Sequence, residues 1–191
     1  MTRRTWTGLT MLAASVATAA SAASAAGCTT APADDRVTID TPFSSEAAFG
    51  PVANYLDHRC GSLDCHGNVA RNLVVYGCEG LRLEPYDAPI CSRVQGGRAT
   101  TSDEHQATYR SLVGLEPTVM SEVVANHGQN PDLLTFVRKA RGEEAHKGGA
   151  LITPGDVQDV CITSWLAGAT DTTACASAIS EPAFPTLSTG P

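Results

Sequence analysis

The chain has 191 residues, 42% of them hydrophobic, and a formal net charge of -7. A chain of this length can bury one ordinary core but hardly two. Without the two arginines of the leader described next, 11 Lys+Arg remain against 20 Asp+Glu, a net charge of -9. This balance argues against nucleic acid as a partner and against electrostatic attachment to anionic lipid.

Residues 1–27 are typical of a signal peptide, with two arginines near the start and an Ala-rich apolar run over residues 9–26. The run ends in Ala-Ala-Gly-Cys28, which resembles a lipobox, so we expect Cys28 to be lipidated and to become the mature N-terminus. Signal-peptidase cleavage near Ala25 or Ala26 is the alternative. No second long apolar stretch follows, so the expected location is the cell envelope, lipid-anchored and facing the periplasm or the exterior.

Residues 28–43 are polar and suit a tether. The folded domain is predicted over residues 44–169, beginning with a helix that starts at Ser44 or Ser45, where a hydroxyl can cap it. Apolar residues then recur at helical spacing and give this helix one face for burial: Phe49, Val52, Tyr55 and Leu56.

The helix would run directly into the segment Cys60-Gly-Ser-Leu-Asp-Cys65-His66-Gly67. Two cysteines followed at once by a histidine indicate covalent haem attachment: the thiols add to the haem vinyl groups and the imidazole binds the iron. The usual spacing leaves two residues between the cysteines, and here there are four. A small-loop Cys60–Cys65 disulfide and a zinc site that includes Cys78 are the alternatives, although an oxidising compartment disfavours zinc thiolates.

On these residues the chain resembles c-type cytochromes, in which variants with four intervening residues occur in some multihaem members. The resemblance implies a mainly α, class I-like domain with one haem c, held by Cys60, Cys65 and His66. It implies an electron carrier rather than an enzyme, with a redox partner protein that the sequence does not identify. A non-redox, disulfide-stapled envelope lipoprotein with a structural or binding role is the alternative function.

After the motif, two short β-rich runs, 73–76 and 81–83, flank a Gly-containing turn and predict a small β-hairpin. Long loop sequence follows over residues 84–100. Arginines gather in this part of the chain, and one or two of them are candidates to pair with haem propionates, the alternative being solvated charges: Arg71, Arg82, Arg93 and Arg98.

The second half of the domain reads as helices. Thr101-Ser-Asp-Glu104 is a capping box that opens one helix, and Pro117 restarts another that ends at Gly128. A short segment follows Asn130-Pro131. The last helix is predicted to start at Thr153-Pro154, with Thr153 as the cap, and the tail over residues 170–191 is expected to be polar.

Cysteine arithmetic leaves six cysteines besides Cys28. If haem uses the first two, local pairing predicts the disulfides Cys78–Cys91 and Cys161–Cys175, the second holding the tail. Three disulfides without haem satisfy the same parity.

For the sixth iron ligand we choose His146, because the glycines that follow it let the backbone pass close to a flat cofactor. It lies just before the last helix, where the resemblance places a distal-ligand loop, with methionine commoner there. His66 and His146 are therefore the predicted iron ligands. The rivals are His58, tied to the proximal side, His105 and His127, expected in solvent, and Met120, expected in the core.

Overall fold

The computed structural model of the chain describes residues 38–84 and 98–180. The predicted leader, Cys28, Arg93 and Cys91 lie outside these ranges. The elements described here belong to the compact unit that begins at Ile39. No helix within the two ranges is long and apolar enough to cross a membrane.

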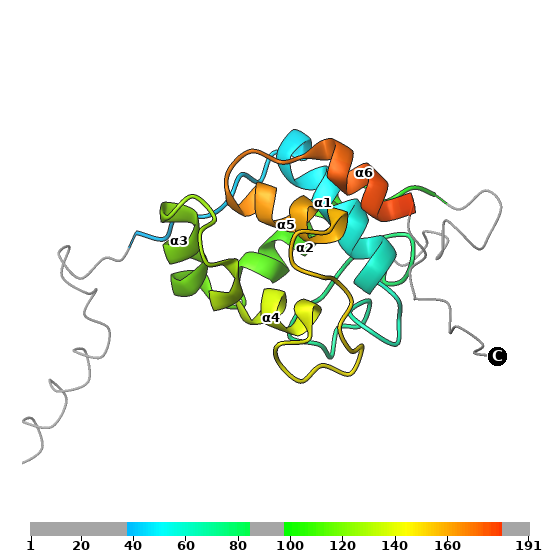
Figure 1. Cartoon of the computed structure of the whole chain (residues 1–191). Coiled ribbons are helices and arrows are strands. Elements are labelled where there is room, and N and C mark those ends of the chain that lie inside the picture. The colour runs from blue at the N-terminus through cyan, green and yellow to red at the C-terminus, as the bar shows by residue number, and fades with distance from the viewer. Residues whose placement is uncertain (1–37, 85–97, 181–191) are drawn as a thin grey trace, which may run out of the picture. The chain divides into compact units, whose positions relative to one another are not determined.

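The described residues are mainly helical, as predicted, and three helices, α1, α5 and α6, pack against one another while α2 packs against α1 (Figure 1). In chain order the elements are α1 (Glu46–Cys60), α2 (Ser102–Val113), α3 (Pro117–Ala125), the 3-10 helix η2 (Pro131–Leu133), α4 (Thr135–Arg141), α5 (Val157–Leu166) and α6 (Thr172–Ser180).

A cluster of three aromatic rings joins α1, α2 and α5 at the centre of the core. The ring centre of Phe49 lies 5.3 Å from that of Tyr109 and 5.0 Å from that of Trp165. The polar ends of the two larger rings are satisfied: Tyr109 donates to the carbonyl of Pro42 and Trp165 to the carbonyl of Phe43. Burial with a satisfied polar end lets these rings hold the segment before α1 against the core.

The predicted capping box at the start of α2 is confirmed. The Thr101 hydroxyl accepts a hydrogen bond from the Glu104 N–H, and the Glu104 carboxylate accepts one from the Thr101 N–H. The predicted start of the helix after His146 is wrong by three residues. This helix, α5, is capped by Asp156 and not by Thr153. The Asp156 carboxylate accepts from the N–H of Asp159 at 2.7 Å, so the residues before it form a turn.

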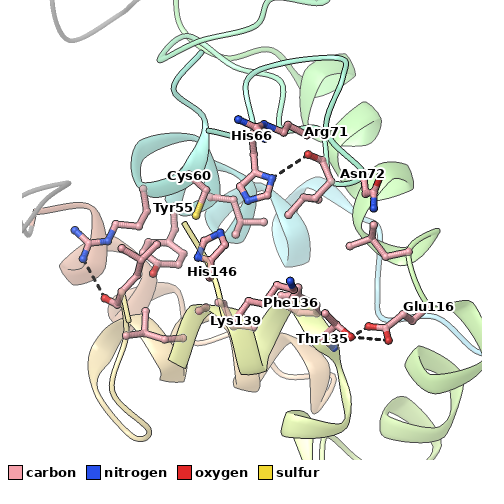
Figure 2. A pocket seen from close by; sticks show the side chains of 18 of the residues that line it. Tyr55, Cys60, His66, Arg71, Asn72, Glu116, Thr135, Phe136, Lys139 and His146 are labelled. Carbon is pink, nitrogen blue, oxygen red and sulfur yellow. Dashed lines mark hydrogen bonds between the residues drawn. The ribbon is translucent and has the colours of Figure 1, made fainter. Parts of the chain in front are cut away.

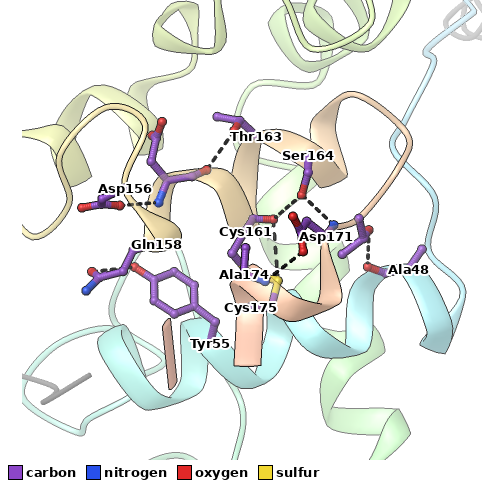
Figure 3. The surroundings of a disulfide bond; sticks show 12 residues. Ala48, Tyr55, Asp156, Gln158, Cys161, Thr163, Ser164, Asp171, Ala174 and Cys175 are labelled. Carbon is purple, nitrogen blue, oxygen red and sulfur yellow. Dashed lines mark hydrogen bonds between the residues drawn. A yellow bond between two sulfur atoms is a disulfide. The ribbon is translucent and has the colours of Figure 1, made fainter. Parts of the chain in front are cut away.

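Helix α6 lies where a polar tail was predicted, and a disulfide joins it to α5 (Figure 3). The predicted pairing Cys161–Cys175 is confirmed, with both residues fully buried. Cys78 is also disulfide-bonded, and Cys91, its predicted partner, lies outside the described residues.

The predicted β-hairpin does not form. Within the described ranges this part of the chain has one isolated bridge, Tyr76–Leu81, and no strand. Its backbone N–H groups instead donate to hydroxyls on α2 or just before it: Val74 to Ser111, Tyr76 to Thr108 and Cys78 to Thr100. Side-chain acceptors thus take the place of a partner strand.

Candidate functional site

The segment from Cys60 to Gly67 forms a compact turn at the end of α1. The His66 N–H donates to the carbonyl of Cys60 at 2.9 Å, and the Gly67 N–H donates to that of Ser62. The Gly61 carbonyl packs so closely against Gly67 and Gly80 that neither position has room for a side chain. Backbone hydrogen bonds and close backbone packing therefore fold the four residues between the two cysteines into a tight turn.

Arg71 stabilises this turn through side-chain hydrogen bonds. Its guanidinium donates to the carbonyls of Cys65 and Asp64, each at 3.1 Å. One of the four arginines considered for propionates thus serves the backbone of the motif, and it also lines the cavity described below.

The His66 ring is oriented by the backbone. Its Nδ1 lies 3.0 Å from the carbonyl oxygen of Leu73, which can only accept, so Nδ1 carries the hydrogen and Nε2 carries the lone pair. Burial is the main cause of a lowered His66 pKa, which favours the neutral ring. A neutral imidazole held through its other nitrogen is the usual form of a metal-binding histidine.

His146 comes from the loop between α4 and α5, and its ring lies nearly parallel to that of His66 (Figure 2). The ring centres are 5.9 Å apart and the planes differ by 21°. A metal–imidazole bond is about 2.0–2.1 Å long and the ring centre lies roughly 1.1 Å beyond the nitrogen, so two rings on opposite sides of one ion have centres about 6.2–6.4 Å apart. The observed separation is close to this value.

Both rings line a cavity of about 490 Å³, which is within the range of small-molecule and cofactor sites. Its walls are mainly apolar side chains from α1, α4, α5 and the loops: Leu56, Leu73, Leu115, Phe136, Leu151, Ile152 and Ile162. Three basic residues also line it: Arg59, Arg71 and Lys139. Glu116 lines the cavity as well, so the arrangement suits a mainly apolar group that carries charged or polar substituents.

The two cysteines of the motif differ in position. Cys60 lines the cavity, whereas Cys65 is absent from its lining. Both are free thiols, so the alternative disulfide between them is not formed. Burial raises the pKa of the Cys60 thiol to about 12.

The alternative zinc site is not assembled. Cys78 is disulfide-bonded and supplies no thiolate. Across residues 38–84 and 98–180, no group of three or more His, Cys, Asp or Glu side chains lies close enough to hold a metal ion.

Of the rival ligands, Met120 is buried in the core, as expected, and His127 is exposed. The expectation for His105 is wrong: it is buried between α1 and α2. Its Nδ1 lies 2.6 Å from the Glu46 carboxylate, and its Nε2 lies 3.0 Å from the Asn54 side-chain oxygen. The sequence around His105 does not distinguish it from a solvated histidine, because its hydrogen-bond partners belong to α1 and not to α2.

Among the other arginines, Arg82 does not line the cavity. Its buried guanidinium forms two hydrogen bonds with Glu104, at 2.7 and 3.0 Å. Arg98 is absent from the lining as well. Sequence reasoning missed Arg59, which donates to the carbonyl of Leu151 at 3.0 Å and so links α1 to the end of the His146 loop. Its place directly before Cys60 was the available signal.

Comparison with known proteins identifies no relative: no protein-family model, no curated protein and no solved structure matches the chain. The function is therefore argued from the site and its chemistry.

Proposed function

We propose that the protein is an electron-transfer c-type cytochrome that holds one haem c between His66 and His146. The observation that carries this proposal is the pair of nearly parallel imidazole rings, 5.9 Å apart, at one mainly apolar cavity. Because Nδ1 of His66 donates to the Leu73 carbonyl, the lone pair of this ring is on Nε2 and can bind a metal ion.

The free cysteines support a covalent link. The chain forms a disulfide at Cys78 and another between Cys161 and Cys175, yet leaves Cys60 and Cys65 as thiols. In covalent attachment the sulfur adds to a vinyl carbon and the thiol proton goes to the neighbouring carbon. Cys60 lies on the cavity wall and is the better supported link, whereas Cys65 must turn toward the cavity to form the second.

The other residues of the site have roles that follow from their chemistry. Most of the cavity wall is apolar, and Arg71, which uses Nε and Nη2 for the motif carbonyls, has Nη1 left to donate to a carboxylate of the cofactor. Lys139 is already paired with Glu144 at 3.2 Å. When bound, haem supplies reversible one-electron chemistry. Two imidazole ligands favour a lower reduction potential than a histidine and a methionine do.

We propose further that the mature chain is anchored through lipid on Cys28 to a membrane of the cell envelope and faces the periplasm or the exterior. A cell-envelope location agrees with disulfide bonding at Cys78 and Cys161–Cys175. Its partner would be another redox protein, and the acidic composition argues against nucleic acid.

The proposal is tested by expressing the chain with a haem-attachment system and staining a denaturing gel for haem peroxidase activity. We expect a stained band and a six-coordinate, low-spin spectrum. His146→Ala should give a high-spin spectrum, while the matched core change Met120→Leu should leave the spectrum unchanged. A colourless protein whose mass fits disulfides and no haem would support the disulfide-stapled module instead.

A further inference from the structure

The two histidines differ at the nitrogen that faces away from the proposed metal position. Nδ1 of His66 donates to the carbonyl of Leu73 at 3.0 Å. Nδ1 of His146 is buried and has no hydrogen-bond partner in the described part of the chain. A metal-binding histidine almost always donates this second N–H, which fixes the ring and strengthens the ligand. His66 has this support and His146 lacks it.

The surroundings of His146 explain why the partner is missing. A Cβ atom placed on Gly148 would lie 3.2 Å from Cε1 and 3.4 Å from Nδ1 of the His146 ring. The edge of the ring that carries Nδ1 therefore faces Gly148, which has no side chain that could accept a hydrogen bond.

The loop that carries His146 is fixed at its base and exposed at its tip. The N–H groups of Leu151 and Ile152 both donate to the carbonyl of Ala140, at 2.8 and 3.1 Å. Residues 147–150 are exposed, Gly149 has a positive φ of 74°, and a Cβ atom placed on Gly149 would meet no other atom within 4 Å. The tip can therefore change its backbone conformation without disturbing the core.

We infer that His146 is an exchangeable ligand, so that a small uncharged ligand of the carbon monoxide or imidazole class binds in its place while His66 stays bound. The inference rests on the proposed haem and adds to electron transfer a ligand-binding site on the His146 side. Most of the cavity wall is apolar, and an uncharged ligand enters it without losing the hydration shell of a charge, whereas the basic residues of the wall are those proposed for the haem carboxylates.

The test is a titration of the haem-loaded, dithionite-reduced full chain with carbon monoxide, followed by absorption spectroscopy. We expect a saturable shift of the Soret band in the wild type. In Gly148→Ser the new hydroxyl lies beside Nδ1 and can accept its hydrogen. The apparent dissociation constant for carbon monoxide should then rise about tenfold above that of Gly148→Ala, the matched variant with the same Cβ and no acceptor.

If the low-spin, haem-loaded wild type shows no shift at saturating carbon monoxide while His146→Ala does, His146 is a permanent ligand and the inference is overturned, with the proposed function intact. A wild type that is already high-spin overturns the inference because His146 then does not bind the iron. Equal affinities of Gly148→Ser and Gly148→Ala overturn the role given to Nδ1. A protein without haem overturns both proposals.

Discussion

The guanidinium of Arg141 and the carboxylate of Asp159 form a two-bond ion pair, with Nε–Oδ1 and Nη2–Oδ2 distances of 2.9 and 3.0 Å. The pair joins the last residue of α4 to the first turn of α5, and the two side chains are only 10% and 6% exposed. The same carboxylate accepts from the Gly155 N–H at 2.9 Å. Because His146 lies between Arg141 and Gly155, Asp159 fixes both ends of its loop.

We expect Arg141→Ala to lower the free energy of unfolding by about 3–5 kcal/mol, because it leaves the buried Asp159 carboxylate without its cation. Urea denaturation followed by circular dichroism measures the change. Arg110→Ala, at an exposed arginine, is the control and should stay within about 0.5 kcal/mol of the wild type. A loss of less than about 1 kcal/mol for Arg141→Ala would show that the buried Asp159 carboxylate does not depend on the Arg141 cation for its stability.

Gly67→Ala should open the turn formed by residues 60–67. A methyl group at this position would overlap the Gly61 carbonyl, so the backbone must move, at a cost of about 1–3 kcal/mol or more. We expect a lower free energy of unfolding and a strongly reduced yield of haem-stained protein. Leu63→Ala changes an exposed side chain of the same turn and should preserve both. Normal haem attachment in Gly67→Ala would mean that attachment does not depend on the tight backbone turn.

Stability should depend on pH through Asp57. Burial raises its pKa above the ordinary 3.8, and hydrogen bonds from the Thr100 hydroxyl and the Glu79 N–H offset only part of this. Between 3.8 and the raised pKa, the folded state holds a proton that the unfolded state has lost. The contribution of this carboxyl to stability therefore falls as pH rises through that window.

The comparison with Asp57→Asn isolates this contribution. The free energy of unfolding of the wild type minus that of Asp57→Asn should decrease with rising pH from about 3.8 upward and level off above the raised pKa. Chemical denaturation at a series of pH values between about 3 and 7 gives this difference. A difference that increases with pH would show that Asp57 has a lowered pKa instead.

Removing the Cys161–Cys175 disulfide with a double alanine variant should lower the free energy of unfolding by about 3 kcal/mol, the chain-entropy value for a loop of this length. Thermal or urea unfolding under non-reducing conditions measures the loss. Ala176→Ser, beside Cys175 and exposed, is the control. A loss near zero would mean that the packing of α6 alone holds it in place.

Cys28→Ala should release the protein from membranes into the soluble fraction of the envelope, because the lipid chains of a lipoprotein anchor it durably. Fractionation and immunoblotting of both forms give the result, and the mass of the mature N-terminus identifies the lipid. A wild type that is already soluble, with an N-terminus near Ala26, would contradict the lipobox prediction.

Local rules predicted much of the fold where the signals lie 14 residues or fewer apart in the sequence. The capping box of Thr101 and Glu104 and the pairing of Cys161 with Cys175 are of this kind. The choice of His66 and His146 as iron ligands stays a prediction; the structure brings their ring centres to 5.9 Å from each other.

What the sequence did not predict depends on partners far along the chain. His105 is buried because Glu46 and Asn54 of α1 bind its two nitrogens, and no pattern within α2 indicates this. The hairpin failed for a related reason, since hydroxyls such as Thr108 accept the hydrogen bonds that a second strand would have accepted. Helix α6 was missed because it is short and its stability comes from packing against α1 and α5, which are distant or separate elements in the sequence.

The raised pKa of Cys60 has a consequence for the reactivity of this thiol. Oxidation and disulfide exchange require the thiolate, and burial raises the pKa of the Cys60 thiol, so a smaller fraction of it is thiolate near neutral pH. The folded chain therefore keeps this sulfur reduced for longer than an exposed cysteine would be kept.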